Sequence, residues 1–473
     1  MDLPSTLKSG EIARLFPVIS ETGKEQRASS IFLSVLSAVP QFAHAILSPL
    51  GQRIGARTQI DTYSEVVLKN DAASSKGNRP DGLIVLKTGQ RVWTCLIEAK
   101  VGKSDLQSDQ VERYLKLAKE NGIDAVLTIS NAFAAHPTHH PLAVQRNLLR
   151  KVDLYHLSWR GILIDAVLLH EQSEVKDPEQ AFLLREFIRF FSHDSAGVTG
   201  FSSMPKEWSS AIDQVQAGGK ITKVDGVEIV RAWHQQMRDL SLIMSRIISC
   251  KVGVKLSRTQ INDPEKRLSE DLHTLCDRGY LAADLEIPDT ASPLSVLADT
   301  NARSIRISMS VDAPRDRVRN ASKVSWLLRQ LKDLEIEDVY VTAIWASRAA
   351  NTVLPLFDVR NDPKKIEGGA TGSDIRAFEI TLTSNSARRF SGVRTFIEEL
   401  ETLAPKFYEN VGQHLESWQP SPPKPKHPIT QSDDQEIKPA ATKPAEEPKS
   451  LMAGNAHSDL LEIPNFLKRL SAL

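Results

Sequence analysis

Three hydrophobic patterns follow one another in the first third of the chain, and they predict a mixed α/β domain. Apolar residues at a helical spacing from Ile31 to Val39 predict a helix that opens at residues 22–25, is interrupted at Pro40 and can resume over 41–47. Residues 59–69 are rich in β-branched and aromatic side chains, which favour a strand. An amphipathic helical pattern over 105–121 is followed by the apolar run 123–130, which is typical of a strand buried on both faces. A helix between two strands requires a crossover, so part of the sheet should be parallel.

Two apolar strands predict a β-hairpin that turns at Gly89 and Gln90. Asp81 and Glu98 are equidistant from this turn, so they should lie opposite each other. Lys100 is two residues beyond Glu98, and the strand period of two places it on the same face. Two carboxylates and an amine therefore converge at one end of the hairpin. Such a cluster can hold a divalent cation beside a cationic group that handles a nucleophile or a phosphate oxygen.

Each of these residues also has a purely structural interpretation. Pro80-Asp81-Gly82 is a strong turn sequence on its own. Glu98 and Lys100 would form an ordinary ion pair if they lay on a solvated face of the sheet. The apolar character of the surrounding strands favours the functional interpretation, because the polar end of a core hairpin needs an explanation.

The letters Pro80-Asp81 followed by Glu98-Ala99-Lys100 resemble the signature of the PD-(D/E)XK phosphodiesterase superfamily. The order of predicted elements (helix, three strands, helix, strand) matches as well, over about a quarter of the chain. The resemblance implies an α/β fold with a restriction-endonuclease-like core, in which helices flank a mixed sheet.

The resemblance also implies a role for each residue of the motif. Asp81 and Glu98 would bind the metal, with Mg²⁺ as the default ion and Mn²⁺ as a substitute. The backbone carbonyl of Ala99 would complete the ligand set. Lys100 would position the attacking water or help to deprotonate it, and would counter the charge of the scissile phosphate.

A further acidic residue is implied by the same resemblance, and two positions are candidates. Glu25 matches the superfamily's glutamate on the first helix and would act as a catalytic and metal-binding residue. It also stands three residues after Thr22, so it can instead complete a capping box. Glu65, on the first predicted strand, is the other candidate.

Gln110 and Tyr114 are one helical turn apart and face the same way. They resemble the Q-x-x-x-Y motif of the superfamily branch that includes the RecB nuclease domain. This likeness implies that the pair supports the active-site lysine or contacts the DNA backbone. The alternative is an ordinary amphipathic helix.

The composition narrows the class of protein. Lys plus Arg and Asp plus Glu both total 59 in 473 residues, so any basic groove for DNA must be local. Cys95, Cys250 and Cys276 lie far apart, which argues for a reducing compartment and against a zinc or iron–sulfur site. No apolar run reaches membrane-spanning length and the first residues lack an export signal, so we expect a cytoplasmic protein without membrane contact.

The chain divides into five predicted parts. Residues 1–170 form the nuclease-like domain, 171–204 a helical connector, and 205–417 an α+β domain of unknown role. The proline- and charge-rich residues 418–456 predict a disordered linker. Residues 457–473 regain apolar positions and predict an amphipathic peptide that docks on a protein partner.

The string LEIPNFLKR near the end of the chain resembles the C-terminal peptide of the bacterial tubulin-like division protein. That peptide is also displayed on a disordered linker. Asn465 and Lys468 depart from its commonest form. The alternative is that this segment packs on its own chain.

The sequence thus predicts a Mg²⁺-dependent deoxyribonuclease whose partner is DNA. In this hypothesis residues 205–417 select the target or regulate access, and the tail recruits a protein. By analogy with the superfamily, the role would be in bacterial defence or stress. The alternative is a non-catalytic nucleic-acid-binding or adaptor protein that retains a nuclease-like fold.

Overall fold

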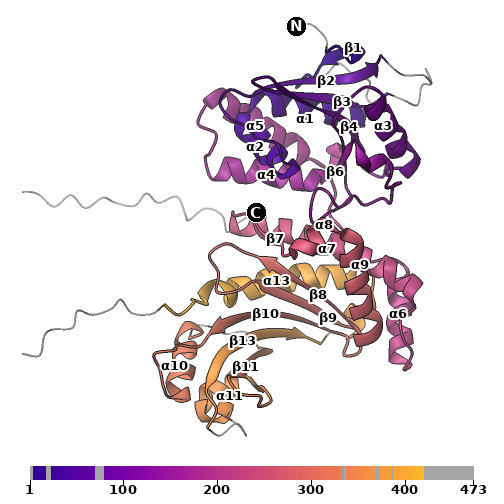
Figure 1. Ribbon diagram of the computed structural model, residues 1–473. Helices are drawn as coiled ribbons and strands as arrows, with labels where there is room; N and C mark the ends of the chain where they lie inside the picture. The colour runs from indigo at the N-terminus through magenta and orange to yellow at the C-terminus, as the bar shows by residue number, and fades with distance from the viewer. Residues whose placement is uncertain are drawn as a thin grey trace, which may run out of the picture. The chain divides into compact units, whose positions relative to one another are not determined.

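The computed structural model describes most of the chain up to Gln419, namely residues 4–16, 23–69, 79–332, 334, 337–367, 372–385 and 387–419. Over these residues the protein is a mixed α/β structure with two β-sheets (Figure 1). The predicted linker, apart from its first two residues, and the predicted docking peptide lie outside the described residues.

The first sheet has six strands in sequence order: β1 (Leu7–Ile12), β2 (Gln59–Leu68), β3 (Gly82–Thr88), β4 (Arg91–Ala99), β5 (Ala125–Ser130) and β6 (Asp153–Ser158). Strands β1 to β4 pair antiparallel, whereas β4, β5 and β6 pair parallel. The expected mixed sheet flanked by helices is therefore confirmed. Strand β1 was not predicted, because its sequence LKSGEI lacks an apolar alternation.

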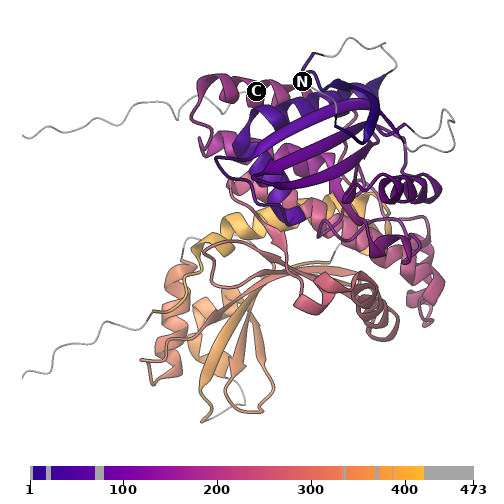
Figure 2. The same cartoon turned by 45° about the horizontal axis from the view of Figure 1, so that its top comes forward.

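Helices cover both faces of this sheet (Figures 1 and 2). The strand period of two sends Ile84 and Leu86 to one face and Leu83 and Val85 to the other. The first pair packs with α1 (Lys24–Ala38), α2 (Pro40–Leu47), α4 (Trp159–Glu171) and α5 (Pro178–Phe191). The second pair packs with α3 (Ser108–Glu120). Helix α5, which falls in the predicted connector, thus shares the core of the first sheet.

The second sheet is antiparallel and has the strand order β12 (Thr352–Pro355), β11 (Val339–Trp345), β13 (Ile375–Ser384), β10 (Ser304–Asp312), β9 (Leu294–Asp299), β8 (Tyr280–Glu286) and β7 (Gly253–Val254). One face packs on α6 (Glu207–Gln216), α7 (Lys223–Ile248) and α13 (Thr395–Asn410) in one hydrophobic core. The remaining α-helices are α8 (Arg258–Asn262), α9 (Pro264–His273), α10 (Asn320–Gln330), α11 (Leu356–Asn361) and α12 (Ala387–Ser391). Helix α7 also contacts α4, where Arg160 Nε lies 3.1 Å from Asp239 Oδ1.

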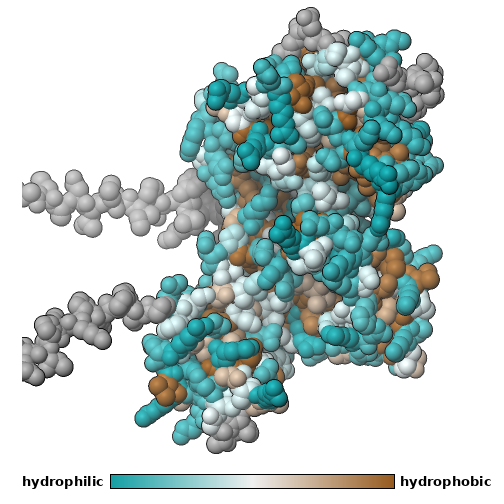
Figure 3. All heavy atoms as spheres, in the orientation of Figure 1, coloured by the Kyte–Doolittle hydropathy of each residue, from teal (hydrophilic) through white to brown (hydrophobic). Residues whose placement is uncertain are grey.

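Hydrophobic residues on the face drawn in Figure 3 are scattered among hydrophilic ones. Single exposed apolar side chains of this kind are normal on protein surfaces. Among the described residues, no single helix is long and apolar enough to cross a membrane; α1 and the turn-and-helix segment Pro40–Leu50 pass that test only as a pair bent by 112°.

Gly82 allows α1 to pack directly on the first residue of β3. A Cβ atom at this position would clash with Leu33 Cδ1 of α1 and lie 2.8 Å from the carbonyl oxygen of Tyr63. The glycine of the Pro-Asp-Gly sequence therefore serves close packing between a helix and a strand. It does not form the hairpin turn, which lies at Gly89 with φ of 62°.

We expect Gly82→Ala to lower the free energy of unfolding by about 1–3 kcal/mol, because the added methyl overfills a packed contact. Urea unfolding followed by circular dichroism measures this change. Gly55→Ala is the matched control, since no atom lies within 4 Å of a Cβ built there. Equal stability losses in the two variants would show that α1 does not press on β3 as described.

Candidate functional site

Asp81 and Glu98 lie opposite each other at the end of the β3–β4 hairpin, as predicted from their equal distance in sequence from the turn at Gly89 and Gln90. The ladder runs from Thr88 paired with Arg91 to Gly82 paired with Ile97, so the next pair is Asp81 and Glu98. Oδ2 of Asp81 accepts a hydrogen bond of 2.7 Å from the backbone N–H of Ala99. Among the described residues, no hydrogen-bond donor reaches its other oxygen, Oδ1.

Lys100 joins this pair of carboxylates. Its Nζ atom lies 2.6 Å from Glu98 Oε1 and 3.3 Å from Glu25 Oε2. Its backbone is held on both sides, because its N–H donates to Ile129 O at 2.8 Å and its carbonyl accepts from Trp159 Nε1 at 2.9 Å. The position of the lysine backbone is therefore fixed by the parallel strand and by the core.

The structure brings the Glu25 carboxylate to Lys100, whereas Glu65 contacts Asp81 through its backbone, N–H to carbonyl oxygen at 3.1 Å, and its carboxylate is directed to Arg79. Glu25 is in the first turn of α1, whose N-cap is Gly23 without any side-chain cap, and its carboxylate points to Lys100. Thr22, the partner in the predicted capping box, lies outside the described residues. Glu65 has φ of 54° and its carboxylate pairs with Arg79 at 2.8 Å.

Gln110 and Tyr114 reach the site from α3. Gln110 Nε2 donates to Glu98 Oε1 at 2.7 Å and lies 3.2 Å from the Tyr114 hydroxyl. That hydroxyl donates to the carbonyl oxygen of Arg79 at 3.3 Å. The pair belongs to a hydrogen-bonded cluster around Glu98 rather than to a solvated helix face.

Trp159 is the member of this cluster that sequence reasoning missed. Its side chain is fully buried, stacks on Phe191 with ring centroids 4.9 Å apart, and donates to the Lys100 carbonyl. A tryptophan at the start of a helix is usually a core residue. Its contact with the site depends on tertiary packing, so no local pattern could have revealed it.

Burial and the interactions between neighbouring charges shift the pKa values of the three central residues. Burial raises the pKa of Asp81 well above its usual range, and the charge of Glu98 raises it further, against the lowering effects of the Ala99 amide and Lys100. Burial also raises the pKa of Glu98, although Lys100 opposes this shift. Burial lowers the pKa of Lys100, but the neighbouring carboxylates raise it more, so the net shift is upward and the amine stays protonated. Negative charge on these two carboxylates is therefore unfavourable without a nearby cation, and a bound metal ion would offset it.

The shifted pKa of Asp81 predicts an unusual dependence of stability on pH. Between the ordinary and the raised pKa, the folded protein binds more protons than the unfolded chain, so stability falls as the pH rises through this window. Asp81→Asn removes the charge and keeps an oxygen for the Ala99 amide. We expect this variant to melt at a higher temperature than the wild type at pH 7 in EDTA.

The higher melting temperature of Asp81→Asn should disappear at about pH 3, where the aspartate of the wild type is protonated and therefore as neutral as the asparagine of the variant. Asp61→Asn is the control, because it breaks an ion pair of 2.8 Å with Lys87 at the other end of the hairpin and should bring no gain. A lower melting temperature for Asp81→Asn at pH 7 would contradict the electrostatic description of the site.

The oxygen donors of the site suit a hard divalent cation. Asp81, Glu98 and the carbonyl of Ala99 are donors of this kind, and Asp81 Oδ1 has no donor partner among the described residues. Within the described part of the chain, however, no three His, Cys, Asp or Glu side chains already form a group that could hold a metal ion. At this site the Glu25 carboxylate lies 3.3 Å from the Lys100 amine.

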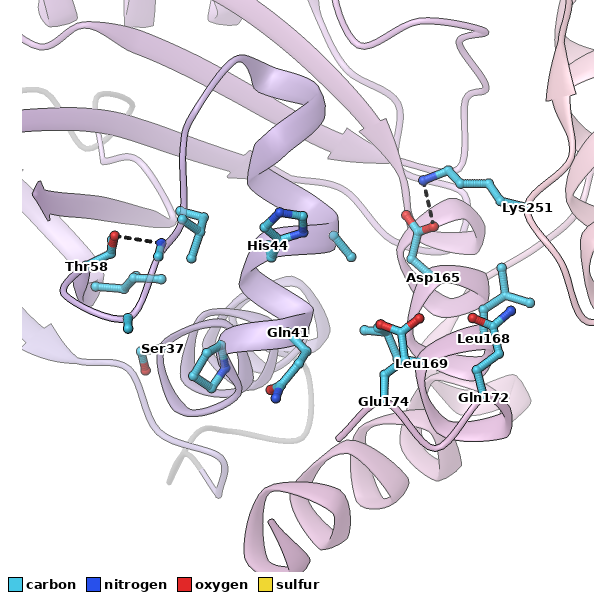
Figure 4. Close-up of a pocket in the computed structure, with 16 residues that line it drawn as sticks. Ser37, Gln41, His44, Thr58, Asp165, Leu168, Leu169, Gln172, Glu174 and Lys251 are labelled. Atoms are coloured by element: carbon cyan, nitrogen blue, oxygen red, sulfur yellow. Dashed lines mark hydrogen bonds and ion pairs between the residues drawn. The ribbon is translucent and has the colours of Figure 1, made fainter. Parts of the chain in front are cut away.

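A cavity of about 610 Å³ lies away from this site and contains none of its residues. Figure 4 shows it between α2, which carries Gln41 and His44, and α4, which carries Asp165. Lys251 closes one side through an ion pair of 3.2 Å with Asp165. The candidate site is instead defined by its converging polar groups.

No protein-family model matches the chain, and no curated protein matches it. The function is therefore inferred from the geometry and chemistry of the site.

Proposed function

We propose that the chain is a Mg²⁺-dependent nuclease that hydrolyses phosphodiester bonds of DNA, with a restriction-endonuclease-like core of the PD-(D/E)XK type. One observation carries this proposal: Asp81, Glu98 and Lys100 meet at the same end of one hairpin. The order of the first six strands and the position of Glu25 on the preceding helix support it.

Two carboxylates and a lysine would have different roles in the reaction. Asp81 and Glu98, with the carbonyl of Ala99, would hold the cation, which supplies Lewis-acid stabilisation of the phosphoryl oxygens and a more acidic water. Lys100 lies beside these carboxylates, where a protonated amine offsets the negative charge that grows on the phosphate. Lys100 would position the attacking water or help to deprotonate it.

The other residues around the site position these groups. Glu25 holds the Lys100 amine from one side, and Gln110 donates to Glu98 from the other. Helix α3, which carries Gln110 and Tyr114, also exposes cationic side chains that suit contacts with a DNA backbone: Arg113, Lys116 and Lys119. These contacts would be sensitive to salt, because they release counterions.

The alternative is a nuclease-like fold that binds nucleic acid or a protein partner without cutting. The observation that favours it is the ion-paired state of Lys100, whose amine is engaged by both Glu25 and Glu98. In that case the network would serve stability, and no metal would be needed.

Incubation of the purified protein with linear, circular and single-stranded DNA separates the two. The proposal predicts cleavage with Mg²⁺ or Mn²⁺ and none with EDTA. DNA binding without cleavage in both metals would favour the alternative. Cleavage that persists in EDTA would overturn the proposed metal dependence.

A further inference from the structure

Arg267 of α9 is a buried cation with little compensation. Its side chain is 7% exposed, and within the described residues it has one ion-pair contact, of 3.8 Å from Nε to Asp271 Oδ2. That oxygen already binds His234 Nε2 at 2.6 Å. Among the described residues, no acceptor forms a hydrogen bond with the guanidinium. The guanidinium nitrogens are not among the described side-chain atoms that are both fully enclosed and unpartnered, so they are open to the cavity that Arg267 lines. A cation held in this largely buried position is available to an oxyanion that enters the cavity.

The side chain lines a cavity of about 490 Å³, which we call the Arg267 cavity. Its walls are the loop after β5, helix α7 and helix α9, including Phe133, Gln235 and Leu268. The volume is within the range of about 300–1,000 Å³ that is usual for small-molecule sites. Apolar walls with a few convergent polar groups are also usual for such sites.

Gln235 supplies a second hydrogen-bond donor. Its Oε1 accepts from the backbone N–H of Phe133 at 3.3 Å, so its amide nitrogen remains as the donor end. Arg231 is one helical turn earlier on α7 and lines the same cavity. It is exposed and pairs with Glu228 at 3.0 Å, which places it at the rim.

Three histidines and two glutamates also line the cavity. Burial lowers the pKa of His140 to about 4 and also lowers the pKa of His234, whose Nε2 contacts Asp271. His139 is held by the carbonyl of Ile261 at 3.0 Å, and burial lowers its pKa, so it is neutral. Glu228 and Glu265 line the cavity, but both side chains are exposed to solvent.

We propose that the Arg267 cavity binds the phosphate group of a small phosphorylated molecule. A guanidinium fork forms paired hydrogen bonds with oxyanions. Donors from two helices surround the space, and a tetrahedral phosphate can present oxygens to them in several directions, whereas the two oxygens of a carboxylate lie in one plane. The inference does not depend on the proposed nuclease activity.

Calorimetric titration of the full chain with inorganic phosphate, AMP and acetate at equal ionic strength tests this site. We expect saturable binding of phosphate or AMP and none of acetate. Tenfold tighter binding of AMP would support a nucleotide as the source of the phosphate. Equal affinities would support free phosphate as the ligand.

Two variants assign the binding to this cavity. Arg267→Met removes the buried charge and fills its volume, so it should fold stably and bind at least about tenfold more weakly. Gln235→Glu keeps an acceptor for the Phe133 N–H but replaces the amide donor with a negatively charged oxygen that repels phosphate. We expect this variant also to bind phosphate or AMP at least about tenfold more weakly. Arg246→Met, exposed on the same helix, is the control. The proposal is overturned if neither phosphate nor AMP binds, or if both cavity variants bind as the wild type does.

Discussion

Asp81→Ala is expected to lower the rate of DNA cleavage at least about 10³-fold. The metal ion that this carboxylate would hold stabilises the transition state by several kcal/mol, and each 1.36 kcal/mol corresponds to about a factor of ten. The measurement is the initial rate of cleavage of a labelled duplex under single-turnover conditions with Mg²⁺. A small effect is not expected, because Asp81 lies directly opposite Glu98.

Lys100→Met should cause a comparable loss, and Lys87→Met is its matched control. Both lysines are on the same hairpin and both pair with a carboxylate, Lys100 with Glu98 at 2.6 Å and Lys87 with Asp61 at 2.8 Å. Only Lys100 is at the end where the carboxylates converge. Unchanged cleavage by the Lys100 and Asp81 variants would mean that the active site lies elsewhere or that a contaminant cuts the DNA.

Trp159→Ala is expected to lower the free energy of unfolding by about 3–5 kcal/mol, because it leaves a large cavity in the core of the first sheet. The indole packs on Phe32 and Phe191 and has no exposed surface. Chemical unfolding followed by circular dichroism measures the loss. The lower stability of Trp159→Ala should reduce DNA cleavage mainly because a smaller fraction of the protein is folded.

Trp159→Phe separates the packing of the indole from its hydrogen bond. It keeps most of the ring volume but leaves the Lys100 carbonyl without its donor, at a cost of about 1–3 kcal/mol, and should reduce cleavage by folded protein. Trp208→Phe is the control, since the Trp208 indole N–H also donates to a backbone carbonyl, that of Phe390, in the hydrophobic core of the second sheet. If both variants cut DNA equally well, Trp159 does not position the lysine.

The meeting of Asp81, Glu98 and Lys100 could be predicted from the sequence because it depends on local rules. A tight turn fixes the register of a hairpin, and a period of two fixes which side chains share a face. The antiparallel pairing from Thr88 and Arg91 onward follows those rules without a bulge. The break in the first helix could also be predicted from a local rule, because a proline cannot continue a helix but can begin one, and Pro40 is the first residue of α2.

Contacts between distant segments could not be predicted in this way. Glu25 and Lys100 are 75 residues apart, and Trp159 and Lys100 are 59 residues apart. Whether Glu25 or Glu65 reaches the lysine depends on how α1 packs on β3, which in turn depends on the missing side chain of Gly82. The sequence offers no periodic signal for such packing.

The Arg267 cavity illustrates the same limit at a larger scale. Arg267, Gln235 and Phe133 come from α9, α7 and the loop after β5, and each is unremarkable in its own segment. Their proximity depends on the contacts of α7 with α9 and with the first sheet's loop. A cavity of this kind is therefore visible only in the folded chain.

The proposed nuclease activity requires that Asp81 and Glu98 hold one divalent cation beside Lys100. The most direct test is a crystal of the protein soaked in Mn²⁺, with anomalous scattering recorded at the manganese edge. We predict one anomalous peak within coordinating distance of both carboxylates, and no peak there in Asp81→Asn. An empty site in the wild type at saturating Mn²⁺, with Lys100 still bridging Glu25 and Glu98, would contradict the account.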